Sequence, residues 1–523
     1  MADHGTMQTR VSPWIVTVVL AMATFMEVLD TSVANVSLSH IAGGLASGID
    51  ESTWVLTTYL VANAVMMPIS GWFGTVLGLK RFYLICVALF TISSFLCGLA
   101  GTLNQLILFR ILQGVGGAGM APVVQAMIAE IFPPAKRGLA FAIYGLAVVF
   151  APAIGPTLGG WITDNYSWRW IFLINIPIGM LSLVLTAWLV SEPPSTRIER
   201  DRLFAGGFRV DSIGFALTVL GIGCLEFFVD RGEREDWFAS PVITAMAITS
   251  AVSLLALVWW EMRRRDPIVD IPLLKIPSFL AAFVTMFALG FILFGSTALL
   301  PQFLEQLLGY TASQAGLALT AGGITMVVMM PMVGGYFVRK FPGRNLVLVG
   351  LALEAASLFH MTGFTLGIPF EHAVWARVFQ TVGLAFLFVP ITQAAYANLP
   401  PGKSGNAAAL INLARNLGGS VGIAITGTIV AQRSQFHQSR LGEHVSAYSS
   451  ESAAAVAGLS HALGGSAGSA HEALARIYQL VLRQAAMLAY IDVFLFMAIG
   501  TLCIIPLALF LPKGCPKAGT AAH

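Results

Sequence analysis

The stretch VSPWIVTVVLAMATFMEVLDTSVANVSL, residues 11–38, is an almost uninterrupted apolar run that nevertheless contains two acids. At a rise of about 1.5 Å per residue, a helix of this length can cross the hydrocarbon core of a bilayer. One arc of about 80° on that helix holds the acids and two small residues that follow them: Glu27, Asp30, Ala34 and Ser37. The stretch is therefore predicted to be a transmembrane helix with a single polar stripe.

The two acids are the first candidate functional residues. A carboxylate at the centre of a bilayer costs about 2.5 to 3.5 kcal/mol on insertion scales, so intramembrane acids usually face a cavity or an oppositely charged partner. Burial also favours the neutral form of a carboxyl group, which makes proton uptake and release accessible. We predict that Asp30 and Glu27 carry protons; a structural ion pair beside a permanently protonated acid is the alternative.

The whole chain has the composition of a polytopic helical membrane protein. Of its 523 residues, 57% are hydrophobic and 11% are charged, whereas soluble domains carry about 25% charged residues. Its mean hydropathy is +0.79, and the alternating strands of an outer-membrane barrel are absent from the sequence. A net charge of +3 predicts no nucleic-acid binding. The five cysteines and nine histidines lack ligand spacing, so we predict no metal site.

We count fourteen spans, with both termini on the cytoplasmic side. The predicted spans are residues 13–38, 53–75, 82–102, 105–130, 138–162, 169–191, 209–229, 239–261, 279–301, 313–338, 345–367, 371–398, 406–431 and 487–511. This count places 19 of the 29 basic residues in cytoplasmic segments and three in short external loops, the bias described by the positive-inside rule. The first run is too long for a signal peptide, so we expect it to be retained as a span.

An internal repeat predicts the architecture. FRILQGVGGA at residues 109–118 matches ARVFQTVGLA at residues 376–385, so that span four corresponds to span twelve. Parallel repeats of six spans, with a binding site between them near the midplane, are the plan of major facilitator transporters. The predicted divisions are a first six-helix half at residues 1–191, a linker with two inserted helices at 192–277, a second six-helix half at 278–511, and a cytoplasmic tail at 512–523.

The segment 432–486 falls outside the membrane in this topology. It is rich in Ser, Ala, Gly and His, so we predict a disordered middle, with a surface helix at residues 471–486. Its histidines are expected to be solvated: His437, His444, His461 and His471.

Further charged residues inside the spans need partners as well. Arg110 and Asp30 lie at depths of roughly 9 and 13 Å from the outer face at the helical rise, so we predict that Arg110 lies close to Asp30, directly or through Gln113 or water. Glu354 and Arg415 share a depth near the cytoplasmic face and are predicted to pair. The candidate residues of a substrate cavity are Asn35, Gln113, Gln380, Arg377, Glu354 and Arg415.

Two further acids lie near the ends of their spans. Glu226 is a third candidate proton carrier; as an alternative, it joins Arg231 in an external cluster. Asp492 is expected to reach toward the membrane surface.

One glycine-rich motif matches the pattern of a nucleotide-binding loop, but its structural context does not fit. Gly114, Gly116 and Gly119 satisfy GxGxxG, but neither a strand nor a βαβ unit surrounds them, so we predict no nucleotide cofactor and no ATPase or other enzyme activity.

Span five combines a proline break with close glycine spacing in Gly155, Pro156, Gly159 and Gly160. Plain helix packing and a flexing seal between the two halves are equally open interpretations of these residues.

Several motifs together resemble the fourteen-span drug:proton antiporters of the major facilitator superfamily, EmrB type. The span-one signature of that family appears in residues 29–35, LDTSVAN; the span-four motif as Arg110, Gln113 and Gly114; and the antiporter motif as residues 155–160. Residues 168–179, WRWIFLINIPIG, and 300–316, LPQFLEQLLGYTASQAG, are also similar. The resemblance covers residues 14–430 and span fourteen.

The chain departs from the family in two places. The loop after span two usually carries an aspartate, but Thr75 stands there, so the gating contact credited to that acid is not expected. Glu27 adds an acid where related chains often have a neutral residue, which suggests cationic substrates or a second proton.

The resemblance implies a proton-driven exporter of amphipathic toxic compounds in the bacterial inner membrane, with a proton gradient in place of a cofactor. It also implies partners beyond the lipid bilayer, namely a periplasmic adaptor and an outer-membrane channel. A dedicated exporter of one metabolite, fatty acid or siderophore is the alternative within the same class. A non-transporting scaffold or sensor is the alternative from another class.

Overall fold

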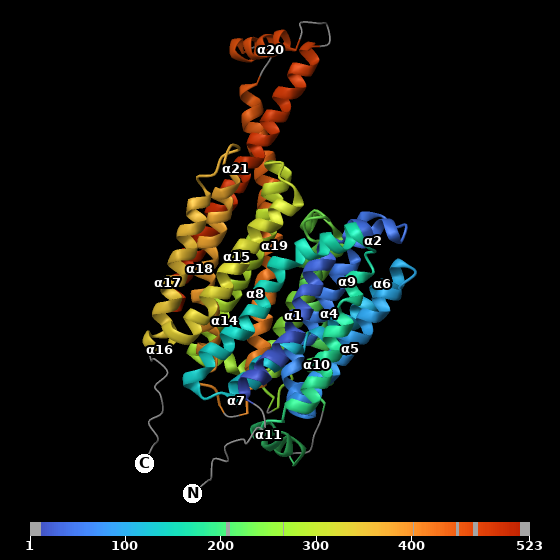
Figure 1. Ribbon diagram of the computed structural model, residues 1–523, viewed down its shortest axis with the longest axis vertical. Helices are drawn as coiled ribbons and strands as arrows, with labels where there is room; N and C mark the ends of the chain where they lie inside the picture. Colours follow the sequence, from blue (N-terminus) through green and yellow to red (C-terminus); the bar gives the residue numbers. More distant parts are fainter. Residues whose placement is uncertain are drawn as a thin grey trace.

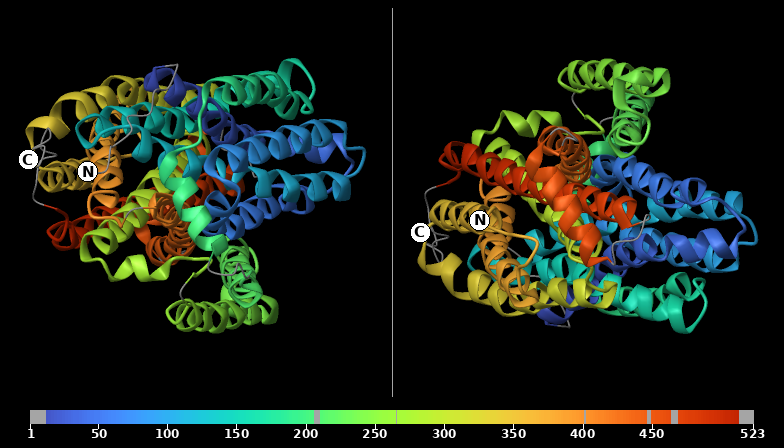
Figure 2. Two further views of the ribbon diagram at one scale, coloured as in Figure 1. Left: turned by 90° about the horizontal axis from the view of Figure 1, so that it is seen from below. Right: turned by 90° about the horizontal axis from the view of Figure 1, so that it is seen from above.

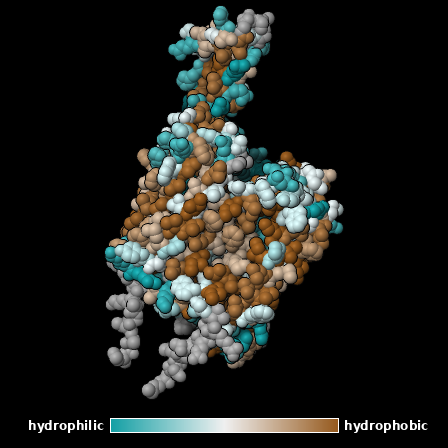
Figure 3. Space-filling view, viewed as in Figure 1, coloured by the Kyte–Doolittle hydropathy of each residue, from teal (hydrophilic) through white to brown (hydrophobic). Residues whose placement is uncertain are grey.

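The computed structural model describes residues 12–205, 210–264, 266–400, 402–445, 449–463 and 469–512, and this part of the chain is helical without a strand. Fourteen helical segments are long and apolar enough to cross a membrane. They stand side by side in one bundle (Figure 1), and apolar side chains dominate its middle between more polar ends (Figure 3). The predicted all-helical fold with fourteen membrane helices is confirmed.

The first six spans contain ten helices. Their bounds are α1 Pro13–Val36, α2 Leu38–Gly44, α3 Ile49–Ser52, α4 Trp54–Leu77, α5 Leu79–Leu99, α6 Leu103–Gly117, α7 Met120–Ile131, α8 Pro134–Asn165, α9 Trp170–Leu173 and α10 Asn175–Leu189. Span four is thus made of α6 and α7, which meet at the glycine-rich stretch that resembled a nucleotide motif. Proline begins α1 and α8, because its missing N–H is not needed in the first turn.

The linker and the inserted pair follow as α11 Pro194–Ala205, α12 Ser212–Arg231, η1 Trp237–Ala239, α13 Pro241–Glu261 and η2 Ile271–Lys275. The inserted helices α12 and α13 stand at one side of the bundle (Figure 2). Helix α12 packs against α4 of the first half and, less extensively, against α19 of the second half.

The last six spans have the bounds α14 Pro277–Gln302, η3 Phe303–Leu307, α15 Ala312–Met332, η4 Val333–Phe337, α16 Val338–Lys340, α17 Gly343–Met361, α18 Phe370–Ala395, α19 Ser404–His444, α20 Ser450–Ala462 and α21 Ser469–Ala508. In Figure 2 the helices of the first half, blue to teal, and those of the second half, yellow to red, form two groups that meet along the middle of the bundle.

The prediction for the external segment is confirmed for the helix at residues 471–486, which is part of α21, and wrong for the middle, which is helical in α20 and at the end of α19. Helices α19 and α21 continue far beyond the predicted ends of spans thirteen and fourteen and, with α20, form a projection at one end of the molecule (Figure 1). Its composition indicated disorder, but the two long helices pack on each other. Asp492 on α21 also accepts hydrogen bonds from Arg433 and pairs with His437 on α19, at 2.5 and 2.7 Å. His437 is therefore paired rather than solvated, and Asp492 has protein partners. Residues 446–448 and 464–468 lie outside the described part of the chain.

The closest helix crossing in the second half depends on glycine. Helices α14 and α19 pack extensively on each other, and a Cβ atom added to Gly418 would overlap the carbonyl oxygen of Phe287. A Cβ atom on Gly290 would likewise overlap the backbone of Arg415. Such close approach is the usual function of small residues at membrane helix interfaces.

We therefore expect Gly418→Ala to destabilise the protein by about 1–3 kcal/mol, the usual cost of overpacking. Thermal unfolding of the detergent-solubilised protein measures this loss. Gly500→Ala is the matched control, because a Cβ atom at Gly500 meets nothing within 4 Å; equal unfolding temperatures for the two variants would contradict the proposed crossing.

Candidate functional site

Asp30 lies at the centre of a buried polar cluster in the first half. One carboxylate oxygen, Oδ2, accepts a hydrogen bond from Nη1 of Arg110 at 2.5 Å. The other oxygen, Oδ1, accepts from Nε2 of Gln113 at 2.9 Å and from Nδ2 of Asn175 at 2.7 Å. The predicted proximity of Arg110 and Asp30 is thus confirmed as a direct ion pair, with Gln113 beside it.

Arg110 is held through its Nε and Nη1 atoms, while its Nη2 is buried without a hydrogen-bond partner among the described residues. Its side chain is fully buried, its Nε donates to the carbonyl oxygen of Val55 at 3.2 Å, and its Nη1 also donates to Oε1 of Gln113 at 2.8 Å. The guanidinium carbon lies 4.2 Å from the ring centroid of Tyr59, a cation–π contact. This arrangement fixes the cation at the carboxylate.

Sequence reasoning missed Asn175 as a member of this cluster. It begins α10 and also donates to the hydroxyl of Ser94 at 3.0 Å. The only signal was its position within the similar stretch 168–179, because a neutral amide is far less costly in a membrane than a charge and so attracts less attention in an apolar helix.

Glu27 lies one turn before Asp30 but outside its hydrogen bonds. Its Oε1 accepts from Nδ2 of Asn63 at 3.1 Å, while its Oε2 is buried without a hydrogen-bond partner among the described residues. The side chain is 7% exposed. Arg415, on α19 of the second half, is close enough for its charge to act on Glu27.

The predicted pair of Glu354 and Arg415 is wrong. Glu354 on α17 accepts a hydrogen bond from Nε2 of Gln380 at 2.8 Å, whereas Arg415 hydrogen-bonds the neighbouring Asn416. Depth in the membrane matched the two residues, but depth does not specify which face of a helix a side chain occupies. Helix α17 packs on α18 and α21, and α19 packs on α14 and α21.

Glu226 does not join the predicted external cluster with Arg231. It is buried and accepts a hydrogen bond from the hydroxyl of Ser420 at 2.5 Å, which links inserted helix α12 to α19. Arg231 instead places its guanidinium 4.3 Å from the ring centroid of Trp54.

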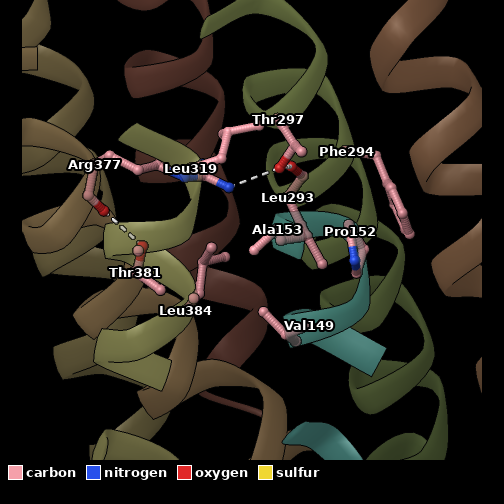
Figure 4. Close-up of a pocket in the computed structure, with 12 residues that line it drawn as sticks. Val149, Pro152, Ala153, Leu293, Phe294, Thr297, Leu319, Arg377, Thr381 and Leu384 are labelled. Carbon is pink, nitrogen blue, oxygen red and sulfur yellow. Dashed lines mark hydrogen bonds between the residues drawn. The ribbon is translucent and has the colours of Figure 1, made fainter. Parts of the chain in front are cut away.

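The second half repeats the Arg-x-x-Gln arrangement around Arg377. Its Nη1 donates to Oε1 of Gln380 at 2.7 Å and to the hydroxyl of Ser296 at 3.0 Å, and its Nη2 donates to the hydroxyl of Thr297 at 2.7 Å. Arg377 also lines a cavity between α8, α14, α15 and α18 (Figure 4).

That cavity is closed to substrates in this conformation. The volume open to the centre of a water molecule is about 10 Å³, roughly the room that one water requires. Its lining is apolar apart from Arg377 and two threonines, Thr297 and Thr381. A drug-sized molecule therefore needs the halves to move apart.

Asn35 and the glycines of span five lie elsewhere. Asn35 is exposed near the outer end of α1, away from the hydrogen bonds of Asp30. Added Cβ atoms on Gly155 and Gly159 would meet Ser32 and Val33 of α1, and one on Gly160 would meet nothing within 4 Å. Two of these glycines therefore serve close packing within the first half, while a gating role for them and for Pro156 stays a prediction.

The contact between the halves is carried by other residues, many of them polar and on the cytoplasmic side. Gln125 on α7 accepts hydrogen bonds from Asn412 at 3.0 Å and Tyr396 at 3.3 Å. Nearby, Glu130 accepts from Ser404 at 2.7 Å. These hydrogen bonds join the two halves at their cytoplasmic ends.

The missing aspartate after span two has a counterpart elsewhere. At Gly71, an added Cβ atom would lie 2.6 Å from Oδ1 of Asn406 on α19, so the two halves meet closely there. Asn406 donates to Asp270 at 3.1 Å, and Lys403 pairs with the same acid at 2.7 Å. The charged contact at this seam thus involves Asp270 rather than position 75.

Comparisons with known proteins agree with this geometry. The sequence profile of the Major Facilitator Superfamily matches residues 20–423. The multidrug export protein EmrB of Escherichia coli K12 is 37% identical over 436 residues, 83% of each chain. The fatty acid resistance protein FarB of Neisseria gonorrhoeae is 37% identical over 448 residues, 86% of each chain.

Solved structures share the fold at low sequence identity. The proton:xylose symporter XylE superimposes with a TM-score of 0.58 at 15% identity, over 94% of this chain and 95% of XylE. The human organic anion transporter MFSD10 gives 0.57 at 13% identity, over 94% and 100%. The chain therefore belongs to the Major Facilitator Superfamily and is a multi-pass inner-membrane transporter of the EmrB type.

Proposed function

We propose that this protein is a proton-coupled exporter of amphipathic toxic compounds that alternates between inward- and outward-facing states. The observation that carries the proposal is the fully buried contact between Asp30 and Arg110 in the first half of a two-half transporter. Relatives at 37% identity are named multidrug export proteins, which supports export as the direction of transport.

The Asp30 cluster provides a means to bind and release a proton. Three donors, one of them cationic, satisfy the ionised carboxylate in this conformation. If the halves move and Arg110 withdraws, a buried carboxylate is left without its cation, a state that costs several kcal/mol. Taking up a proton removes that cost. Arg110 thus couples the proton on Asp30 to the conformation, and Glu27 and Glu226 are further candidates for assisting it.

Substrates bind between the halves in this proposal. Arg377 is the candidate polar residue that lines the cavity in this conformation, and the apolar lining near Pro152 and Phe294 contacts the rest of the molecule. The other candidates, Gln113, Gln380, Glu354 and Arg415, are buried and reach a substrate only after the halves move. Asn35 contributes from the outer end of α1. An apolar cavity with few polar groups fits many amphipathic compounds of similar size.

A dedicated exporter of fatty acids is the second candidate. It is favoured by FarB, a relative of equal identity that is named a fatty acid resistance protein. A susceptibility panel of dyes, antibiotics and long-chain fatty acids in a pump-deleted host separates the two: broad protection indicates multidrug export, and protection from fatty acids alone indicates the dedicated exporter.

We also propose that the projection formed by α19, α20 and α21 contacts a periplasmic adaptor, which in turn reaches an outer-membrane channel. The projection lies on the outer side of the predicted topology. It carries a groove of about 600 Å³ lined in part by Leu474, Ile477, Tyr478 and Val481, and the side chains of Leu474 and Tyr478 are about half exposed.

Asp30→Asn is expected to abolish proton-coupled export, because an amide cannot exchange a proton. In everted vesicles with an acidified interior, added substrate should release protons from the wild type and not from the variant. In cells, the variant should give the susceptibility of the pump-deleted host. Asp50→Asn, an exposed acid on α3, is the control; undiminished substrate-driven proton release by Asp30→Asn would end the proposal.

The strength of the ion pair follows from a double-mutant cycle. Asp30→Asn and Arg110→Gln should each destabilise the protein by about 3–5 kcal/mol, because each leaves one buried charge unpaired. The double variant should lose much less than the sum, since it removes both charges. Thermal unfolding of purified protein measures all three; additive losses would show that the two charges do not stabilise each other.

Adaptor docking can be separated from transport itself. Leu474→Glu combined with Tyr478→Glu should lower resistance in whole cells, because charges in the groove disfavour an apolar contact. The same variant should retain wild-type transport in everted vesicles, where no adaptor is needed. Gln306→Glu, exposed elsewhere, is the control, and wild-type resistance of the groove variant would contradict the adaptor contact.

A further inference from the structure

The second half contains a buried acid that the Asp30 mechanism does not use. Glu354 is fully buried on α17, its Oε1 accepts a single hydrogen bond from Gln380, and its Oε2 has no hydrogen-bond partner among the described residues. Gly383 on α18 makes room for this group: a Cβ atom there would lie 3.0 Å from Oε2 of Glu354. The carboxyl group therefore fits a space that glycine leaves open.

The environment of Glu354 is a variation on that of Asp30. In both halves an arginine donates to the glutamine three residues later, and that glutamine donates to an acid, at 2.9 Å to Asp30 and 2.8 Å to Glu354. In the first half the acid lies on α1, whereas in the second it has moved to α17. Ser296 and Thr297, on α14, receive the hydrogen bonds of Arg377 instead.

This change removes the ion pair. Within the described part of the chain, neither Glu354 nor Arg377 has an oppositely charged atom within 4.0 Å, and Gln380 is the residue that hydrogen-bonds both. Arg377 has three neutral acceptors, and its Nε is buried without a partner. A buried carboxylate with one unsatisfied oxygen and no adjacent cation is costly, whereas a neutral carboxylic acid is not.

Few charged groups act on Glu354. Arg377 on α18 is the charged residue that interacts with it, and α21, the other helix packed on α17, contributes none among the described residues. Asp492 on α21 is engaged by Arg433 and His437. The charge state of Glu354 therefore depends on how closely Arg377 approaches it.

Arg377 is in turn in contact with the surface between the halves. A Cβ atom on Gly322 of α15 would lie 3.0 Å from Cγ of Arg377, and one on the adjacent Gly323 would lie 2.8 Å from Cβ of Ala153 on α8. Arg377 also lines the central cavity together with Pro152 and Ala153 (Figure 4). Movement of α8 across α15 therefore changes the space in which the guanidinium lies.

We propose that Glu354 is a second proton carrier of the transport cycle, discharged by Arg377 through a shift around Gln380. This rests on the proposed proton-coupled export. In the structure described here, with the halves joined at their cytoplasmic ends, Glu354 holds its proton. When the halves reverse, Arg377 moves onto the carboxyl group, the O–H bond breaks with its electron pair left on the carboxylate, and the proton passes to water on the cytoplasmic side.

The first test detects the proton without any substrate. Infrared spectra of the purified full-length protein should show a C=O stretching band of a protonated carboxyl group that Glu354→Gln removes. Glu305→Gln, at an exposed acid of the same half, should leave the band in place, and Glu354→Asp should restore it. Identical spectra of wild type and Glu354→Gln, with both proteins folded by thermal unfolding, would overturn the proposal.

The second test measures coupling in proteoliposomes with ethidium as the probe. The ratio of protons to ethidium should be lower in Glu354→Gln than in the wild type, because one intramembrane proton carrier is lost. Glu354→Asp should keep the wild-type ratio. An unchanged ratio in Glu354→Gln would overturn the proposal while leaving the role of Asp30 intact.

Failure of the proposed proton-coupled export gives a different experimental result from failure of the Glu354 proposal. If Asp30→Asn exports ethidium with protons as the wild type does, the proposed function fails, whatever Glu354 does. The infrared measurement still decides whether Glu354 holds a proton. Arg377→Gln tests the positioning residue. In this variant the C=O band of protonated Glu354 should persist to higher pH than in the wild type. If the band titrates as in the wild type, discharge by Arg377 is excluded.

Discussion

A guanidinium buried in a membrane needs polar partners at fixed positions, and in the first half of this protein that partner is an acid. Arg110 is fully buried and 2.5 Å from the carboxylate of Asp30. Around it, α1, α4, α6 and α10 each contribute a hydrogen-bonding group, so the ion pair also sets how these helices pack. A change in their arrangement changes the environment of both charges, which is the physical link between conformation and proton binding.

The contact between the two halves on the cytoplasmic side is built differently. Some of its contacts are neutral hydrogen bonds, such as that between Gln125 and Asn412, which each contribute only about 0.5–1.5 kcal/mol net; others involve the carboxylates of Glu130 and Asp270. Several such bonds close the gap without making its opening prohibitive. The fully buried ion pair therefore lies within one half, whereas the contacts that join the halves are hydrogen bonds between polar side chains.

The sequence predicts best those contacts whose absence would cost the most free energy in the membrane, above all the pairing of buried charges. A buried arginine needs an acid, and only Asp30 lay at a matching depth in the same half, so that pair was predictable. Glu354 and Arg415 also matched in depth, but α17 packs on α18 and α21 whereas α19 packs on α14 and α21, and depth alone does not specify which helices are neighbours. Asn175 escaped because amides can enter apolar helices with little penalty. The middle of the projection was predicted to be disordered because its Ala, Gly and Ser composition is typical of disordered segments. Contacts between α19 and α21, including that of Asp492 with Arg433, stabilise the projection as helix.

The two halves share the Arg-x-x-Gln motif but place the acid beside it differently. In each, hydrogen bonding to the glutamine three residues later holds the arginine in place, so the arginine does not need an acid at one particular position to be ordered. That leaves the acid free to change helices. On α1 it contacts the arginine directly and is satisfied as an anion; on α17 it contacts only the glutamine, and its second oxygen is left without a donor. Because the glutamine amide has both a donor and an acceptor, it fits either arrangement, and the position of the acid alone determines whether the half contains an ion pair or a separated acid and base.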